Sequence, residues 1–122
     1  MIHYYCTNIT KDLINKYKSS DNLLRHVDPK DDGKMLIAKW SGKLIGYVAW
    51  DKGTITALEV LKDFQGNGFS KILLEEALKE GCTTLTVNRN NKKAIGVYEH
   101  LGWKCAGQLG PKMLIYVHYN KI

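Results

Sequence analysis

The sequence predicts a mixed α+β fold, in which a mostly antiparallel sheet of about seven strands carries helices on both faces. Short apolar segments of strand length, longer segments with helical spacing, and glycine-containing turns between them together predict this class. The chain has 122 residues, of which 44% are hydrophobic, and it contains only two prolines and no low-complexity tract. We therefore expect a single domain over residues 1–122.

The first half of the chain is expected to form four strands and two helical segments. Thr10 is a suitable N-cap for the first helix. Ser41-Gly42 between two apolar segments is typical of a hairpin turn, and residues 51–53 give a second turn. Strands are expected at residues 2–7, 34–40, 43–50 and 54–61, and helices at about residues 11–18 and, as a weaker pattern, 19–28.

The second half is expected to alternate helices and strands. After the glycine-rich residues 63–71, apolar side chains keep helical spacing as far as Gly81. A second helix follows Asn91 and ends at Gly102. Strands are expected at residues 83–87, 103–107 and 112–119. The complete order is β-α-α-β-β-β-α-β-α-β-β.

The charge of the chain narrows its possible partners. The formal net charge is +6, but only Arg25 and Arg89 among the 18 basic residues are arginines, and the lysines are scattered. Proteins that read nucleic acids usually cluster their charge and use arginine for base contacts. We therefore expect no nucleic-acid partner, and a small polyanionic ligand fits the diffuse charge at least as well.

Membrane, metal and disulfide signals are weak throughout the sequence. No apolar segment is long enough to span a membrane, and residues 1–12 lack the continuous apolar stretch of a signal peptide. We therefore expect a cytoplasmic protein with no membrane partner. Cys6, Cys82 and Cys105 lie far apart without the spacing of a zinc site, so they are expected to be reduced thiols, and no metal is expected.

The segment DFQGNGFSK, residues 63–71, lies between an expected strand and an expected helix and is suited to bind an anion. It lacks the GxxxxGK[ST] spacing of a P-loop, and Lys71 stands at the third glycine position of a dinucleotide fingerprint. Gly66 and Gly68 allow successive backbone N–H groups to point at one spot, where the positive end of the following helix adds to them. Lys71 supplies a further mobile charge.

Two motifs in this half of the chain resemble one known family. Gln65, the two glycines and the following small residue resemble the acyl-CoA pyrophosphate loop of the GNAT superfamily of N-acyltransferases, and LEVLKDFQG is similar to the strand that precedes it, although Lys62 replaces a frequent proline. The resemblance covers about residues 55–106, with Ser70 where glycine or alanine is usual. The family's downstream signature is matched by NKKAIGVYEHLGW at Asn91, Ala94, Tyr98, Glu99, Gly102 and Trp103.

The resemblance implies a sheet that is splayed between its fourth and fifth strands, with acetyl-CoA as co-substrate in the gap. The pantetheine arm is expected along Leu58 and Val60, where a main-chain N–H would bond the thioester oxygen. The pyrophosphate is expected on the loop amides, and Asn91 beside the pantetheine arm. The implied cofactor-binding residues are Leu58, Val60, Gln65, Gly66, Asn67, Gly68, Phe69, Ser70, Lys71 and Asn91.

Tyr98 is implied as the general acid for the departing CoA thiolate. With pKa values of about 10 for tyrosine and about 8.5 for a thiol, full transfer is uphill by roughly 2 kcal/mol. Either the site lowers the pKa of Tyr98, or its phenol mainly donates a hydrogen bond. The glutamate that some members carry on the strand before Asn91 is Thr86 here, so Glu59 is the candidate base, with ordered water as the alternative. His100 is expected to face solvent.

The sequence therefore predicts an acetyl-CoA-dependent N-acetyltransferase that transfers an acetyl group directly to a primary amine. The acceptor is expected to be a polypeptide lysine or N-terminus, or a small amine, and the enzyme a monomer or homodimer. Two other functions stay open. One is a catalytically inactive CoA-binding or interaction module of the same fold, and the less favoured one is a small basic RNA-binding domain.

Overall fold

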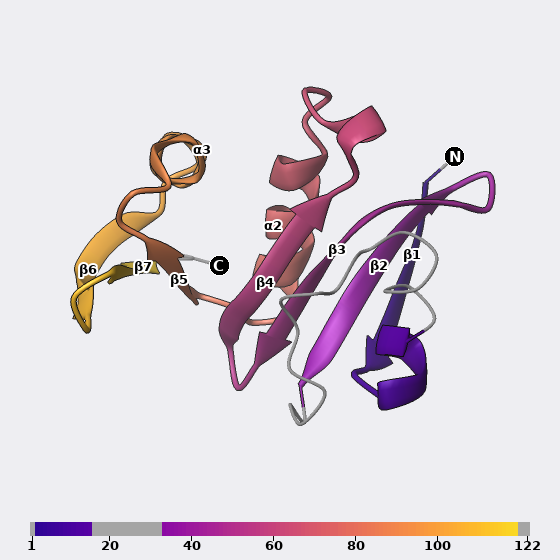
Figure 1. Ribbon diagram of the computed structural model, residues 1–122, viewed down its shortest axis with the longest axis horizontal. Coiled ribbons are helices and arrows are strands. Elements are labelled where there is room, and N and C mark those ends of the chain that lie inside the picture. Colours follow the sequence, from indigo (N-terminus) through magenta and orange to yellow (C-terminus); the bar gives the residue numbers. More distant parts are fainter. Residues whose placement is uncertain (1, 16–32, 120–122) are drawn as a thin grey trace.

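The computed structural model describes residues 2–15 and 33–119 (Figure 1). Its strands are β1 (Ile2–Asn8), β2 (Lys34–Trp40), β3 (Lys43–Asp51), β4 (Thr54–Val60), β5 (Thr84–Asn88), β6 (Lys104–Leu109) and β7 (Met113–Val117). The helices are α2 (Phe69–Lys79), α3 (Lys92–His100) and the short 3-10 turn η1 (Lys62–Phe64). Residues 11–15 are also helical, whereas the weaker segment expected at residues 19–28 lies outside the described residues.

The strands form one sheet in the order β1-β2-β3-β4-β5-β7-β6. Neighbouring strands are antiparallel except β4 and β5, which run parallel. The expected seven-stranded, mostly antiparallel sheet is therefore confirmed. The β2–β3 turn has positive φ at both central residues, 48° at Ser41 and 81° at Gly42, as a type I′ hairpin requires.

The parallel pair β4–β5 is joined only at its beginning. Thr54 and Ile55 of β4 lie opposite Thr84 and Leu85 of β5, and the pairing goes no further. Beyond these residues the two strands diverge, so that β5, β6, β7 and α3 form a second lobe beside the one built from β1 to β4 and α2 (Figure 1). The expected splay lies between the fourth and fifth strands.

An additional residue in β4 accompanies the end of this pairing. Trp50 of β3 lies opposite Ile55, but its neighbour Ala49 lies opposite Ala57, which leaves Thr56 as a bulge. A bulge bends its strand and increases the local twist. Because it directly follows the last residue of β4 that is paired with β5, it accounts for the direction in which β4 leaves its neighbour.

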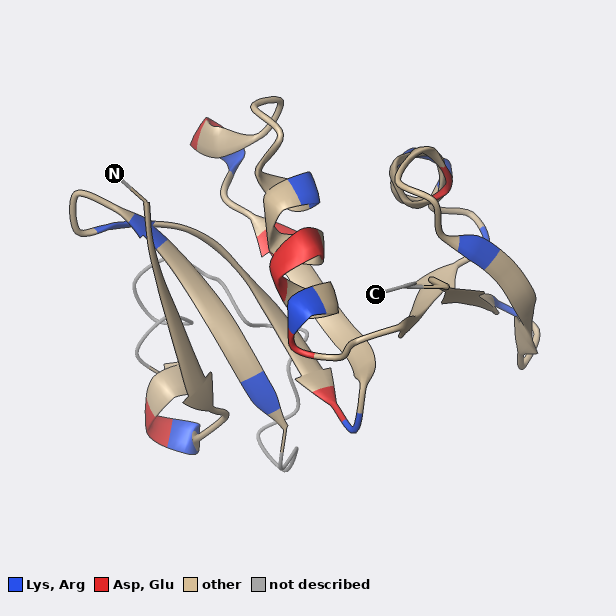
Figure 2. Ribbon diagram, turned by 180° about the vertical axis from the view of Figure 1, so that it is seen from behind, with Lys and Arg blue, Asp and Glu red and all other residues tan. Residues whose placement is uncertain are grey.

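Hydrophobic side chains cover both faces of the sheet at β2 and β3. On one face, Leu36 and Val48 belong to a core that includes Leu73 of α2. On the other face, Met35 belongs to a second core with Ile14 from the helical residues 11–15. Helix α2 lies behind the sheet in Figure 1 and in front of it in Figure 2, which shows the molecule from the opposite side. Helices on both faces of the sheet are thus confirmed.

The element boundaries differ from expectation mainly in the last two strands. Strand β7 covers only Met113–Val117 of the expected residues 112–119, and the other strand that differs is β6. This strand continues to Leu109, two residues beyond the expected end, because a register shift between Cys105 and Gly107 lets it stay paired with β7. Within the described residues, none of the helices has both the length and the apolar character needed to cross a bilayer.

Candidate active site

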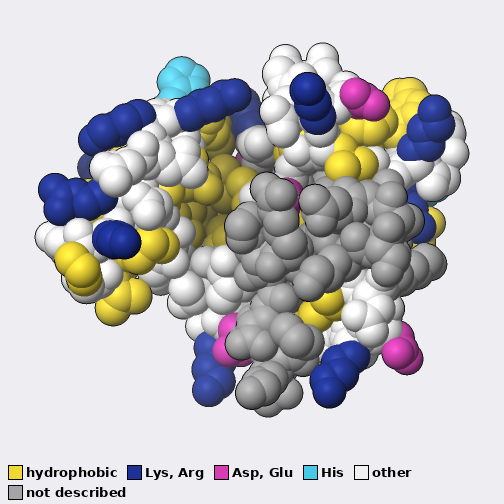
Figure 3. All heavy atoms as spheres, in the orientation of Figure 1, with side chains coloured by type: hydrophobic (Ala, Val, Ile, Leu, Met, Phe, Trp, Pro, Cys, Tyr) yellow, Lys and Arg dark blue, Asp and Glu magenta, His cyan; other side chains and the backbone are white. Residues whose placement is uncertain are grey.

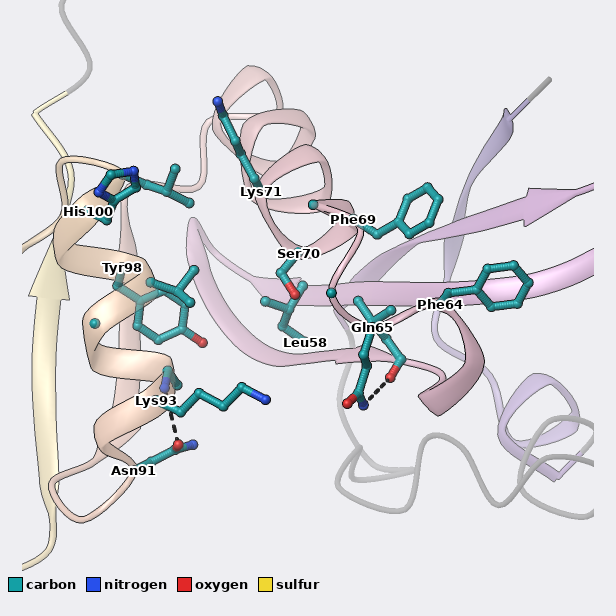
Figure 4. A pocket seen from close by; sticks show the side chains of 17 residues that line it. Leu58, Phe64, Gln65, Phe69, Ser70, Lys71, Asn91, Lys93, Tyr98 and His100 are labelled. Carbon is teal, nitrogen blue, oxygen red and sulfur yellow. Dashed lines mark hydrogen bonds between the residues drawn. The ribbon is translucent and has the colours of Figure 1, made fainter.

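A cavity of about 840 Å³ opens between α3 and the unit made of β4, the glycine-rich loop and α2. Hydrophobic side chains are visible inside the hollow between the two lobes (Figure 3), and Figure 4 shows the residues that line it. Its lining comprises Leu58, Val60, Phe64, Gln65, Gly66, Gly68, Phe69, Ser70, Lys71, Asn91, Lys93, Ala94, Gly96, Val97, Tyr98, His100 and Leu101. All the residues proposed from the sequence are among them except Glu59 and Asn67.

The glycine loop presents unused hydrogen-bond donors to this cavity. Gly66 and Gly68 have φ of 82° and 80°, and a Cβ built on either would meet no atom within 4 Å. Within the described part of the chain, the main-chain N–H groups of residues 66–71 donate to no acceptor, and the first helical bond of α2 comes from Ile72. Convergent free amides at the start of a helix form an anion-binding site.

Side chains of the loop fix its shape. Gln65 donates from Nε2 to the main-chain oxygen of Val60 at 3.0 Å. Asn67 donates from Nδ2 to the main-chain oxygens of Phe64 and Gln65, both at 3.4 Å. The rings of Phe64 and Phe69 pack edge to face, with centroids 6.0 Å apart. The Asn67 side chain therefore closes the loop on itself and does not line the cavity, which leaves only its main-chain amide for a ligand.

The free edge of β4 supplies further main-chain groups. Leu61 donates its N–H to Ile45 of β3 at 2.8 Å. Because the main-chain groups of successive strand residues point to alternate sides, those of Leu58 and Val60 point away from β3, toward the gap. Beyond Ile55 this edge has no pairing with β5, so the N–H groups of Leu58 and Val60 and the Leu58 oxygen are available to a ligand lying along the strand, whereas the Val60 oxygen already accepts from Gln65.

Helix α3 places Tyr98 on the opposite wall of the cavity. Asn91 caps the helix, since its side chain accepts from the Ala94 N–H at 3.3 Å. The half-buried Tyr98 ring packs against the core, and its hydroxyl points into the cavity (Figure 4). Burial raises the pKa of Tyr98, so the phenol keeps its proton at physiological pH.

Glu59 lies apart from this cavity. Strand alternation turns its side chain to the face opposite Leu58 and Val60, as the sequence indicated. There the hydroxyl of Tyr47, which is completely buried, donates to Glu59 Oε1 at 2.6 Å. The carboxylate is thus held in a fixed position on the other side of β4, where it can face only a molecule that arrives from that side.

The structure adds residues that the sequence did not select. Lys93 and His100, on α3, both line the cavity, although His100 was expected to face solvent only. Their positions relative to Val97, four before and three after it, place them along one side of the helix, so helical spacing could have grouped them with the site. Gly96 and Phe64 also line the cavity.

The charge of the cavity is one-sided. Its lining includes Lys71, Lys93 and His100 but no aspartate or glutamate among the described residues. Lys71 also lies 4.0 Å from Glu75 on α2, a helix along which basic and acidic residues alternate (Figure 2). A concave surface lined by lysines and by no carboxylate attracts anions.

Comparisons with known proteins agree with this geometry. The family described as "Acetyltransferase (GNAT) domain" matches residues 6–117. The peptidyl-lysine N-acetyltransferase YjaB of Salmonella typhimurium is 35% identical over 66 residues, which are 52% of this chain and 45% of that protein. The match therefore spans less than half the length of this relative.

Solved structures show the same fold. The apo form of YjaB from Escherichia coli, determined in solution, superposes with a TM-score of 0.68 at 18% identity, over 99% of both chains. A GNAT family acetyltransferase from Elizabethkingia anophelis, crystallised with acetyl-CoA bound, gives a TM-score of 0.64 at 16% identity, over 96% of this chain and 97% of that one. At these identities the likeness concerns the fold alone.

Proposed function

The chain belongs to the GNAT acetyltransferase family, and we propose that it transfers an acetyl group from acetyl-CoA directly to a primary amine. The observation that supports this best is the arrangement of one cavity: free amides of residues 66–71 lie on one wall and the Tyr98 hydroxyl points in from the other. An anion-binding loop and a hydrogen-bond donor that face a common space can together hold an anionic thioester and stabilise its leaving group.

Binding of acetyl-CoA would use main-chain groups for the most part. The pyrophosphate would accept hydrogen bonds from the amides between Gly66 and Lys71, with Ser70 adding a hydroxyl that lies at the cavity (Figure 4). The pantetheine arm would pair with the gap-facing groups of Leu58 and Val60, beside Asn91. The E. anophelis neighbour, whose structure contains acetyl-CoA, supports the choice of this cofactor.

The chemical step would be an attack of the amine on the thioester carbonyl. A gap-facing N–H of Leu58 or Val60 would stabilise the oxyanion that forms as the new C–N bond is made. When the C–S bond breaks, the electron pair stays on sulfur, and Tyr98 donates a hydrogen bond to the developing thiolate. The amine loses one proton in the process, and the thiolate finally takes one up.

The raised pKa of Tyr98 supports one of its two possible roles. Proton transfer from a phenol of ordinary pKa to a thiolate is already uphill by roughly 2 kcal/mol, and burial of this phenol increases the difference. We therefore assign Tyr98 as a neutral hydrogen-bond donor that lowers the energy of the leaving thiolate, with the final proton delivered later.

Glu59 is proposed as the group that accepts the amine proton. The hydrogen bond from Tyr47 fixes its carboxylate on the face of β4 that does not line the cofactor cavity. An amine entering from that face would meet the carboxylate before the thioester. Ordered water is the alternative acceptor of the proton, and the Glu59–Tyr47 pair would then serve to hold β3 and β4 together.

Incubation of the protein with acetyl-CoA and a panel of peptides and small amines, followed by mass spectrometry, tests the proposal. The name of the Salmonella relative, peptidyl-lysine N-acetyltransferase, makes lysine-containing peptides the first acceptors to try. A gain of one acetyl group on an acceptor amine, dependent on Tyr98, is expected. Tight CoA binding without transfer to any acceptor would instead favour an inactive CoA-binding module.

A further inference from the structure

We infer that Lys93 binds the pyrophosphate from the wall opposite the glycine loop, so that the anion is held from both sides of the cavity. This rests on the proposed binding of acetyl-CoA. Lys93 stands in the first turn of α3, two residues after the cap Asn91, and it lines the cavity. Figure 4 shows its side chain extending from α3 into the gap, in the direction of the wall that carries Gln65.

The side chains of the two cavity lysines, Lys71 and Lys93, extend in different directions. Lys71 belongs to the loop motif, but its side chain extends along α2 away from Gln65 (Figure 4), and its Nζ lies 4.0 Å from Glu75. Lys93 is in no ion pair with any residue that the structure describes. Of the two ammonium groups at the cavity, Lys93 is therefore the one that reaches across it without a competing carboxylate.

The surroundings of Lys93 contain positive charge that would attract an anion. The first turns of α2 and α3 both contribute to the cavity lining, and neither contains an acidic residue. The N-terminus of a helix carries partial positive charge, which disfavours a lysine at that position. Two positive helix ends and an uncompensated ammonium around one space indicate that the ligand supplies the negative charge between them.

The group of acetyl-CoA that best fits this position is the diphosphate. Loop amides on one wall reach one side of it, and they leave phosphate oxygens on the other side directed toward α3. A lysine there can neutralise these oxygens as a mobile point charge. Holding the anion from α3 as well as from α2 would also fix the width of the gap in which Tyr98 meets the thioester.

The test compares Lys93→Met with Lys92→Met in the otherwise intact chain. Methionine keeps the unbranched shape and the helix propensity of lysine without its charge. Exposed Lys92 is the neighbouring lysine that does not line the cavity. Binding of CoA and of 3′-dephospho-CoA is measured by calorimetry at two salt concentrations. Lys93→Met should weaken both ligands about tenfold and reduce the salt dependence, whereas Lys92→Met and the charge-retaining Lys93→Arg should stay within about twofold.

A third ligand separates the diphosphate from the reacting end of the cofactor. S-acetylpantetheine has no phosphate, so its slow turnover should be the same in Lys93→Met and Lys92→Met. If Lys93→Met weakened the binding of CoA but not of 3′-dephospho-CoA, Lys93 would lie at the 3′-phosphate. If Lys93→Met and Lys92→Met bound both ligands equally well, Lys93 would not belong to the site. Either result overturns the inference. If the unaltered chain bound neither CoA nor dephospho-CoA, the proposed function itself would fail, which is a distinguishable result.

Discussion

Replacing Gly68 by valine should separate cofactor binding from folding. Gly68 has φ of 80°, a conformation that costs an L-residue roughly 1–2 kcal/mol. No atom lies within 4 Å of the added Cβ, so the fold should survive with a melting temperature lowered by about 3–8 °C. The same open space is where the pyrophosphate is expected, and the valine side chain would occupy it.

The expected loss of affinity follows from the hydrogen bonds that the valine blocks. A charge-assisted hydrogen bond contributes about 1.5–3 kcal/mol, so losing two of them weakens binding by about 3–6 kcal/mol, or more than a hundredfold. Calorimetric titration with CoA measures the effect. Gly42→Val is the matched control, because Gly42 has φ of 81°, open space around its Cβ, and a position in the β2–β3 turn outside the cavity.

The comparison of these two variants decides whether the loop holds the cofactor. Similar melting temperatures with CoA affinity lost only in Gly68→Val would support the assignment of the loop. If Gly68→Val bound CoA as well as Gly42→Val does, backbone approach at residue 68 would not be part of binding, and the assignment of the loop would be refuted. A variant that fails to fold is recognised by its melting curve, and Gly68→Ala, with a smaller side chain, then takes its place.

Three further predictions concern the reacting groups and the thiols. Tyr98→Phe should lower kcat more than tenfold with CoA affinity almost unchanged, and an equal kcat in the two proteins would exclude the phenol from the mechanism. Because burial raises the pKa of Tyr98, its contribution to the rate should persist to at least about pH 10. Glu59→Gln should lower kcat/KM about tenfold or more with CoA affinity almost unchanged, whereas loss of a merely structural carboxylate would lower the melting temperature and leave kcat/KM nearly unchanged. Burial raises the pKa of Cys82 to about 11, so iodoacetamide at pH 7.5 should modify the exposed Cys6 and Cys105 but not Cys82, and mass spectrometry of the folded protein would contradict this if it found a third adduct.

The sequence predicted the elements whose signals are local. Gly42 adopts its positive φ readily and lies between two apolar segments of strand length, so the β2–β3 hairpin could be placed correctly. Strands β2 and β3 read as nearly continuous apolar segments because both of their faces are buried. The position of Gly68 before a helical pattern likewise marked the start of α2.

The features that the sequence could not show depend on distant parts of the chain. Thr56 looks like any strand residue, and only its partners on β3 reveal it as a bulge. The hydrogen bond between Tyr47 and Glu59 joins residues 12 positions apart on neighbouring strands, so it depends on the register of the pair. Lys93 and His100 look like the polar side of an amphipathic helix until the splay turns that side toward a cavity.

The bulge in β4, the glycine-rich loop and the N-terminal ends of α2 and α3 all shape the same cavity. The bulge at Thr56 directs β4 away from β5, which leaves the groups of Leu58 and Val60 without partners in the sheet. The loop then adds the free amides of residues 66–71, and α3 adds Lys93. Main-chain donors and ammonium groups that have no acceptor within the protein are free to bind an anionic ligand. Because all of them face one cavity without a carboxylate, a single long anionic ligand satisfies the whole set, and its binding should stabilise the two lobes together.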